Sequence, residues 1–388
     1  MIYLDNAAST PLSDDVLNEI LPYLKEYYGN PSSIHKLGRQ AANAIELARK
    51  RISKLINSQG EIIFTSGATE ANNLALKGFA YAMRSKGNQI ITSSIEHEAV
   101  LESCKELQGA GFDVNYLPVD RYGMVDLDAL ERSINEKTIL VSVMFANNEV
   151  GTIQPVKEIV NIVHKHQVIF HTDAVQAVGK IPVDVKKLGV DMITLSAHKM
   201  YGPKGVGALY INNGLKMEPI LHGGGQEKEM RSGTQNVAGI VGMGKAAEVA
   251  LQNIDYYSNN VRNLSDRLIS DLLKNITHSK LNGHPTKRLP NNVHFTFLGV
   301  NGEDLIIKLD ENGIAASTGS ACSVQKQKAS YVLKAMGFNH EEITGSLRLT
   351  LGIQNTSGEI DQTVRTLGNV VSTLREVSPY KFKYALNQ

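Results

Sequence analysis

A lysine that follows an apolar run is placed to do covalent chemistry. Residues 191–195 predict a buried strand, and Ser196-Ala197-His198-Lys199 comes directly after it. A lysine amine attacks carbonyls and forms a Schiff base when desolvation or neighbouring cations lower its charge. For one lysine taken alone, the alternative is an ordinary solvated loop residue.

A carboxylate stands at the end of a second predicted strand, where Asp173 follows Val168 to Thr172. Such a carboxylate can pair with the protonated ring nitrogen of pyridoxal 5'-phosphate (PLP), which the ring requires in order to act as an electron sink. The alternative for Asp173 is a helix N-cap.

A turn of small residues at 66–70 joins a predicted strand at 61–65 to a predicted helix from Ala71 to Met83. This geometry aims backbone N–H groups and the helix dipole at an anion, which favours a phosphate site. The pattern Ser66-x-x-Thr69-Glu70 could instead be a plain helix cap.

His97 follows the strand predicted over 89–95 and begins a helix. Its imidazole could stack on a flat ring and shuttle protons, or it could be a polar surface residue. All four candidates fall at the carboxyl edge of a parallel sheet, where ligands of open α/β folds gather. Together they are far more specific than any one of them.

The chain resembles the NifS/IscS cysteine desulfurase family, in the class V aminotransferase branch of the fold-type I PLP enzymes. The resemblance runs in order from residue 3 to about Pro379. It is carried by Tyr3–Thr10, Gly29–His35, Thr65–Glu70, Glu96-His97, Asn147–Gly151, Asp173–Gln176, Ser196–Lys199, Arg231–Thr234, Gly319–Cys322 and Arg348.

The resemblance implies how the ring of PLP is held. Lys199 forms the internal aldimine, and Asp173 pairs with the pyridinium nitrogen. Gln176 bonds the ring hydroxyl. His97 stacks on the ring and handles protons together with the lysine amine.

The resemblance also implies how the phosphate and the substrate are held. A homodimer is expected, because the phosphate contacts come from Ala68, Thr69, Ser196 and His198 of one subunit and Thr234 of the other. Asn148, also a cofactor contact, and Arg348 clamp the carboxylate of L-cysteine, a bidentate task that suits a planar guanidinium.

Cys322 is implied to be the thiol that takes the sulfur, leaving L-alanine and a persulfide. Its segment, residues 316–328, is small, polar and basic, which predicts exposure and mobility. Lys326 and Lys328 would favour the thiolate. Seen alone, Cys322 could be an inconsequential surface cysteine. Cys104 lies in a helical pattern and is expected to pack in the interior.

The composition excludes several classes of protein. A hydrophobic content of 42% over 388 residues supports a sizeable core, and a formal charge of +1 gives no general pull toward nucleic acid or membrane. Two cysteines far apart argue against a disulfide framework and suit a reducing cytoplasm. We find no signal-like segment, no apolar run of membrane length and no metal motif.

Alternating strand and helix patterns from Glu61 to about Ile211 predict an α/β fold with a mostly parallel central sheet flanked by helices. The last of these strands, Val206 to Ile211, is expected to run antiparallel because it lies so close behind Lys199. We expect a large PLP-binding domain over residues 14–255. A smaller α+β domain, formed by 1–13 and 256–388, would carry the cysteine loop.

Two tempting motifs are set aside. Gly239–Lys245 has P-loop spacing, but Ala246 lacks the hydroxyl that would bind magnesium and no strand precedes it, so packing glycines are the better interpretation. His222–Gly225 resembles a lipase oxyanion loop, yet the chain has no Gly-x-Ser-x-Gly elbow.

Other functions stay open at this level: an ordinary aminotransferase, a selenocysteine lyase, or a partner-binding protein without activity. Ala197 stands where many relatives have glycine, and Ile353-Gln354 where they usually carry an arginine and an aromatic residue. The sulfur acceptor is expected to be an iron–sulfur scaffold protein or another thiolation partner.

Overall fold

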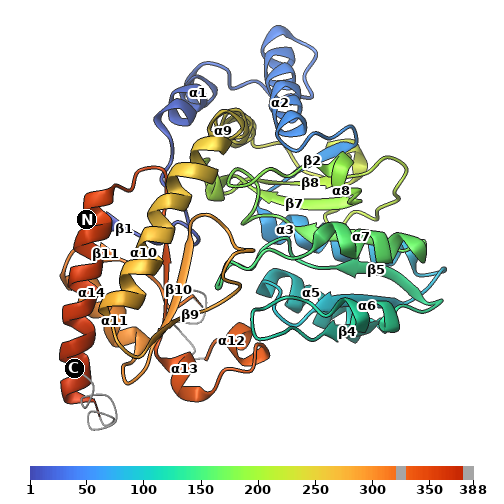
Figure 1. Ribbon diagram of the computed structural model, residues 1–388. Coiled ribbons are helices and arrows are strands. Elements are labelled where there is room, and N and C mark those ends of the chain that lie inside the picture. Colours follow the sequence, from blue (N-terminus) through green and yellow to red (C-terminus); the bar gives the residue numbers. More distant parts are fainter. Residues whose placement is uncertain (320–328, 379–388) are drawn as a thin grey trace.

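A seven-stranded sheet forms the centre of the computed structural model, which describes residues 1–319 and 329–378 (Figure 1). The strand order is β2-β8-β7-β6-β5-β3-β4, and only β8 runs against the other six. This confirms the mostly parallel sheet and its reversed last strand. The strands are β2 (Glu61–Thr65), β3 (Gln89–Ser93), β4 (Asp113–Leu117), β5 (Thr138–Ser142), β6 (Ile169–Asp173), β7 (Met192–Ser196) and β8 (Gly207–Ile211).

Helices bury both faces of this sheet. Successive strand residues point to opposite faces, so Ile62 and Phe64 pack in one hydrophobic cluster whereas Ile63 packs in another. The first cluster contains residues of α1 (Asp14–Lys25), α2 (Lys36–Leu55), α6 (Leu127–Ser133), α7 (Val156–Lys165), α8 (Val185–Leu188) and α9 (Val237–Tyr256). The second contains residues of α3 (Ala68–Asn73), α4 (Phe79–Met83) and α5 (Glu98–Gly109).

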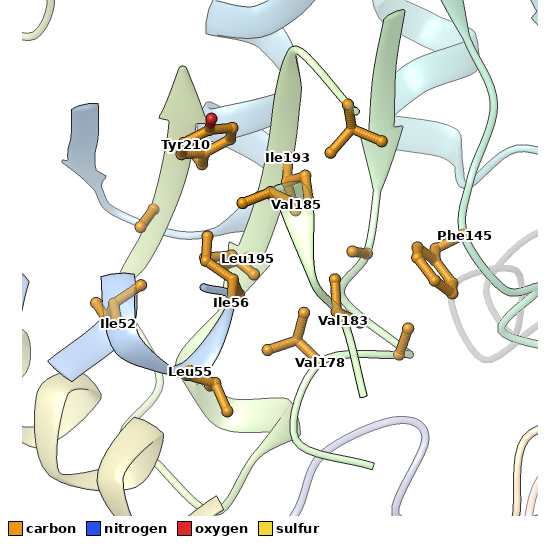
Figure 2. Packing of buried hydrophobic residues seen from close by; sticks show 14 of the residues in the cluster. Ile52, Leu55, Ile56, Phe145, Val178, Val183, Val185, Ile193, Leu195 and Tyr210 are labelled. Carbon is orange, nitrogen blue, oxygen red and sulfur yellow. The ribbon is translucent and has the colours of Figure 1, made fainter. Parts of the chain in front are cut away.

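The end of α2 shows how this packing works. Figure 2 shows Ile52, Leu55 and Ile56 beside Ile193 and Leu195 of β7. Because each such side chain stabilises the fold by about 1.5–3 kcal/mol when fully buried, strands with apolar residues on both sides are held firmly. The residues that come directly after the carboxyl ends of the strands are therefore held on a rigid frame.

A second, smaller part packs beside the first. In its three-stranded antiparallel sheet, β10 (Asn292–Phe297) lies between β12 (Ser346–Thr350) and β9 (Ser279–Leu281). Its core includes residues of α10 (Arg262–Asn275), α11 (Gly302–Glu311) and α14 (Ser357–Val377). Two short helices, α12 (Tyr331–Ala335) and α13 (His340–Thr344), precede β12 in the chain, and α12 packs against Ile95, Met144 and Val150 of the larger part.

The N-terminal arm joins this smaller part: β1 (Ile2–Tyr3) pairs in parallel with β11 (Ile314–Ala315). Ile2 and Leu4 belong to the same hydrophobic cluster as residues of β10, β12 and α14. The domain boundaries themselves stay a prediction.

The glycines of α9 serve helix packing, as expected for the P-loop-like stretch. An added Cβ at Gly244 would lie 2.5 Å from Cα of Ala48 in α2, and one at Gly242 would lie 2.5 Å from Cδ1 of Ile20 in α1. The backbone approach at Gly244 leaves no room for a side chain, whereas a side chain at Gly242 would require Ile20 to shift. No helix within the described ranges, 1–319 and 329–378, is both long and apolar enough to cross a membrane.

Candidate active site

A cavity of about 980 Å³ lies at the carboxyl edge of the central sheet. Its walls come from the segments that follow β2, β3, β5, β6 and β7, together with the N-terminal arm and β12. Ten of the residues expected at the site line it, namely Ala68, Thr69, His97, Asn148, Asp173, Gln176, Ser196, His198, Lys199 and Arg348.

Lys199 ends the short 3₁₀ turn, Ala197–Lys199, that follows β7. Its Nζ donates to the carbonyl oxygens of Ala7 at 2.5 Å and Ala8 at 2.7 Å. The side chain is half-buried at the cavity wall, so Lys199 is not an ordinary solvated loop residue. The N-terminal arm, contributed from the smaller part, holds the amine in place.

Asp173 is the last residue of β6, and only 6% of its surface is exposed. Its Oδ2 accepts a hydrogen bond from Nδ2 of Asn72 at 2.8 Å, and its Oδ1 accepts one from the Val175 backbone N–H at 3.0 Å. The second bond is of the capping type, but turns rather than a regular helix follow. The buried carboxylate therefore faces the cavity while its neighbours hold both oxygens.

The turn between β2 and α3 points the start of a helix at the cavity. Gly67 is the N-cap residue and no side chain caps this helix, so the plain-cap interpretation of Ser66 is wrong. The first N–H groups of a helix have no partners inside it. The turn lies against β8, where an added Cβ on Gly207 would come within 2.6 Å of the Gly67 carbonyl carbon.

Glu70 braces this turn. Its carboxylate accepts from the Ser66 backbone N–H at 2.7 Å and from the Arg231 guanidinium at 2.7 and 3.2 Å. Burial alone would raise the pKa of Glu70, but the hydrogen bonds from Arg231 and Ser66 outweigh it and lower that pKa. Glu70 is thus an anion that ties the segment leading to Thr234 to the turn.

His97 is the N-cap of α5, half-buried at the cavity wall. Its Nδ1 accepts from the Ala99 backbone N–H at 3.1 Å. Because Nδ1 is an acceptor, the hydrogen of the neutral ring is on Nε2. A helix cap therefore sets the tautomer of this imidazole.

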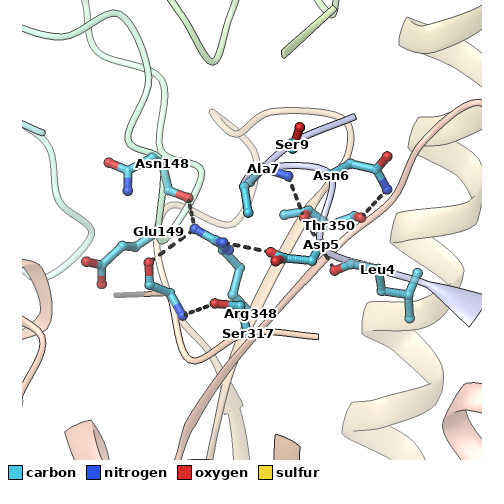
Figure 3. Close-up of polar contacts among 12 residues, drawn as sticks. Leu4, Asp5, Asn6, Ala7, Ser9, Asn148, Glu149, Ser317, Arg348 and Thr350 are labelled. Carbon is cyan, nitrogen blue, oxygen red and sulfur yellow. Dashed lines mark hydrogen bonds and ion pairs between the residues drawn. The ribbon is translucent and has the colours of Figure 1, made fainter. Parts of the chain in front are cut away.

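Arg348 in β12 lies beneath the N-terminal arm and is 2% exposed (Figure 3). Its Nη1 donates to the carbonyls of Asn148 at 3.0 Å and Gly319 at 3.2 Å, and its Nη2 donates to Oδ1 of Asp5 at 2.8 Å. Within the described part of the chain, Nε of Arg348 and Oδ1 of Asn148 are buried without a hydrogen-bond partner.

One expected site residue within the described part of the chain is not on the wall of this cavity. Thr234 is exposed and does not line the cavity of its own chain. Cys322 lies outside the described residues. Ile353 and Gln354, which differ from the residues usual in relatives, form hydrogen bonds outside the cavity. The Ile353 N–H donates to the Tyr201 hydroxyl at 2.8 Å, and Gln354 Nε2 donates to Asn6 Oδ1 at 3.1 Å.

Sequence reasoning gave no role to several groups that the fold brings to the site. Asn72 is one helical turn beyond Ala68, a spacing that could have indicated it. Glu149 is buried at the cavity wall and accepts from the Ser330 hydroxyl at 2.6 Å; burial raises its pKa to about 6. Cys104, by contrast, packs in the core as expected, and burial raises its pKa to about 12.

Comparisons with known proteins agree with one another. The aminotransferase class-V family model matches residues 2–363. Cysteine desulfurase IscS of Methanosarcina thermophila is 53% identical over 379 residues, 97% of this chain and 94% of that protein.

Solved structures are similar over nearly the whole chain. One described as a NifS-like protein superimposes with a TM-score of 0.91 at 41% identity, covering 96% of this chain and 100% of its own. Another, described as SspA in complex with cysteine, has a TM-score of 0.80 at 36% identity and covers 90% and 99%.

Proposed function

Because the chain belongs to the class V aminotransferase family and is a cysteine desulfurase of the IscS and NifS kind, we propose that its cavity converts L-cysteine to L-alanine and leaves the sulfur as a persulfide on Cys322. One observation carries the proposal. Lys199, Asp173, His97 and Arg348, distant in sequence, line a single cavity.

The chemistry of the cavity wall suits PLP. Asp173 offers a buried carboxylate for a ring nitrogen, Gln176 an amide and Lys199 an amine. The buried Oδ1 of Asn148, which has no partner among the described residues, would be satisfied by a donor on a bound molecule. When bound, PLP supplies an aldehyde and an electron sink next to the substrate amino group.

The phosphate would bind at the start of α3, where N–H groups and the helix dipole favour an anion. Ala68 and Thr69 would donate from the turn, and Ser196 and His198 from beyond β7. Burial, together with Lys199 and Lys204, lowers the pKa of His198 to about 4. His198 would contact the phosphate through a ring N–H.

Two side chains, one a base and one a donor, would handle the protons of the substrate. The Lys199 amine, held between the Ala7 and Ala8 carbonyls, is the first. His97 is the second: its capped Nδ1 leaves the hydrogen of the neutral ring on Nε2, from which it would donate toward the bound molecule. Asp173 would keep the opposed ring nitrogen protonated by offering it an opposite charge.

Arg348 and Asn148 would hold the substrate carboxylate. Asp5 already uses one face of the guanidinium. The Nε of Arg348 is buried without a partner among the described residues. A substrate carboxylate would accept its hydrogen bond. This contact orients the amino acid so that its amino group faces Lys199.

Sulfur transfer requires a thiolate. The Cys322 thiolate would attack the substrate sulfur, forming an S–S bond as the Cβ–S bond breaks. The electron pair of the broken bond stays on Cβ, which is then protonated to give alanine. Delivery of the persulfide would require movement of residues 316–328.

A homodimer would complete the phosphate site. Thr234 is exposed on a segment tied to the phosphate turn by the Arg231–Glu70 ion pair. From there it would reach the phosphate of the partner subunit. An iron–sulfur scaffold protein or another thiolation partner would accept the sulfur.

Mass spectrometry of the holoenzyme after addition of L-cysteine tests the proposal. We expect alanine and a gain of one sulfur on Cys322. Cys322→Ser should abolish sulfur transfer. Transamination that survives in Cys322→Ser would indicate an aminotransferase instead, and a colourless chain that fails to bind PLP would contradict the proposal altogether.

A further inference from the structure

Lys180 is buried in the larger part of the molecule, with 1% of its surface exposed. Its Nζ donates to the backbone oxygen of Gln176 at 3.1 Å and to the side-chain Oε1 of Gln176 at 3.2 Å. Within residues 1–319 and 329–378, no carboxylate lies within ion-pair distance of it. Both of these hydrogen bonds go to Gln176, which lines the cavity.

The local backbone explains this pairing. After β6 the chain turns through overlapping bonds, from the Val178 N–H to the Ala174 oxygen and from the Lys180 N–H to the Ala177 oxygen. Gly179 has a φ of +81°, in the left-handed region that favours glycine. The reversal at Gly179 brings the Lys180 side chain back over Gln176.

Packing does not account for a lysine here. An amine buried without a carboxylate loses hydration that two carbonyl-type acceptors replace only in part. An apolar side chain of similar volume is often as stable or more stable at a buried charged position. A methionine would fill the same space without that penalty, so the hydrogen bonds of the amine are its distinguishing contribution.

Gln176 has a side chain whose two ends differ. Because Nζ donates to Oε1, the NH₂ end is directed away from Lys180, and Nε2 donates to the Ala7 oxygen at 3.1 Å. The same oxygen accepts from Lys199 Nζ at 2.5 Å. An amide rotated by half a turn would place two acceptors, Oε1 and the Ala7 oxygen, against each other.

We propose that Lys180 is a positioning residue, which holds the Gln176 amide so that its NH₂ end faces Ala7 and the cavity in front of Lys199. The inference rests on the proposed function, because the amide would donate to a PLP ring oxygen there. Lys180 does not line the cavity and acts through Gln176.

The competing explanation is that the charge of Lys180, rather than its hydrogen bonds, affects PLP binding. Lys199 and Arg348 are the cations that act on Lys180 electrostatically. Burial, followed by these two cations, lowers the pKa of Lys180 to about 7. Because its pKa is lowered, this amine loses charge as the pH rises to 8.5, and an uncharged amine still donates hydrogen bonds. Measurements at pH 8.5 therefore separate the hydrogen bond from the charge.

A double-mutant cycle tests the proposal with Lys180→Met, Gln176→Leu and the double variant. The readouts are the Kd of PLP at pH 8.5 and the visible absorption of the bound cofactor as a function of pH. We expect each single variant to weaken PLP binding by roughly two- to tenfold, the effect of one hydrogen bond. Adding Lys180→Met to Gln176→Leu should then change neither readout.

The matched control is Lys186→Met, which removes an exposed lysine from the neighbouring α8 and should leave both readouts unchanged. An unchanged Kd in Lys180→Met would overturn the proposal. The proposal would also be overturned if Lys180→Met weakened PLP binding equally in the wild type and in Gln176→Leu. That result would indicate that Lys180 acts through its charge or its packing. If Lys180→Met does not fold, Lys180→Gln, whose shorter side chain keeps the site polar, replaces it.

The two hypotheses fail separately. The cycle reads PLP binding and absorption, so it stays interpretable even if the wild-type protein forms no alanine from cysteine. Conversely, alanine and a persulfide formed by the wild type, with an unaffected Lys180→Met, would retain the proposed function and reject the role of Lys180.

Discussion

Nη2 of Arg348 donates to Oδ1 of Asp5 at 2.8 Å, although 343 positions separate the two residues. The guanidinium is almost wholly buried, whereas the Asp5 side chain is one-fifth exposed. The N-terminal arm is therefore part of the cavity wall, and its Asp5 carboxylate pairs with the arginine on the side away from Asn148.

Asp5→Asn keeps the shape of the side chain and removes its charge. Hydrogen bonds to charged groups contribute about 1.5–3 kcal/mol, so the variant should unfold at a clearly lower urea concentration than the wild type. The control is Asp361→Asn, which breaks the exposed pair with Arg267. Exposed pairs contribute about 0–1 kcal/mol. Equal losses in the two variants would contradict the role given to Asp5.

Asp173→Asn should retain PLP but slow alanine formation. A nearby opposite charge shifts a pKa by about 1–3 units, so removing it should lower the protonated fraction of the ring, and the rate, roughly 10- to 1000-fold. Asn72→Leu deletes only the hydrogen bond to Asp173 and should slow the reaction less. Steady-state rates with L-cysteine check both, and a larger loss in Asn72→Leu would reverse the assignment.

Gly207→Ala should damage the phosphate turn. The new methyl group would lie 2.6 Å from the Gly67 carbonyl carbon, and overpacking of this kind destabilises by about 1–3 kcal/mol. We expect a lower melting temperature and weaker PLP binding. Gly368→Ala in α14, where an added Cβ meets nothing within 4 Å, is the control and should be neutral or stabilising.

Glu96 makes stability depend on pH. Burial raises its pKa to about 8, well above the ordinary value of 4.5, although bonds from Ser93 and the Met144 N–H oppose the shift. The folded state thus binds a proton that the unfolded state releases, and this contribution to stability is present below pH 4.5 and is lost as the pH rises toward 8.

Glu96→Gln should remove this contribution. Urea midpoints at pH 5 and pH 8 should therefore fall less with rising pH in Glu96→Gln than in the wild type. Glu102→Gln, on an exposed side chain, should leave the wild-type slope unchanged. Parallel slopes in the wild type and Glu96→Gln would show that Glu96 is ionised in the folded protein.

Several features of the fold and the site follow from local patterns in the chain. The strand before Lys199 and the helix after Gly67 are short-range features, set by apolar alternation and by turn residues. His97 at a helix start is equally local, and the structure has it as an N-cap. The predicted strands over 89–95 and 138–145 end earlier, at Ser93 and Ser142. The apolar pattern extends further because Ile95 and Phe145 are buried in the segments beyond the sheet.

The residues that support the site could not be read in the same way. Three pairs of side chains form hydrogen bonds that local patterns do not predict, because each side chain has other directions open to it. They are Asn72 with Asp173, Glu70 with Arg231, and Lys180 with Gln176. Only Lys180 and Gln176 are close in sequence, and even there the backbone conformation at Gly179 decides whether they meet.

The amino-acid sequence by itself determined the type of fold, the family and the residues able to do chemistry, since these depend on residue types in order along the chain. The tertiary structure alone decided that Ala7 and Ala8 hold Lys199, that Asp5 holds Arg348 and that the amide of Gln176 has one orientation. Such contacts join distant segments, and packing of the N-terminal arm against β12 and the Ala197–Lys199 turn must bring them within hydrogen-bond distance before any of them exists.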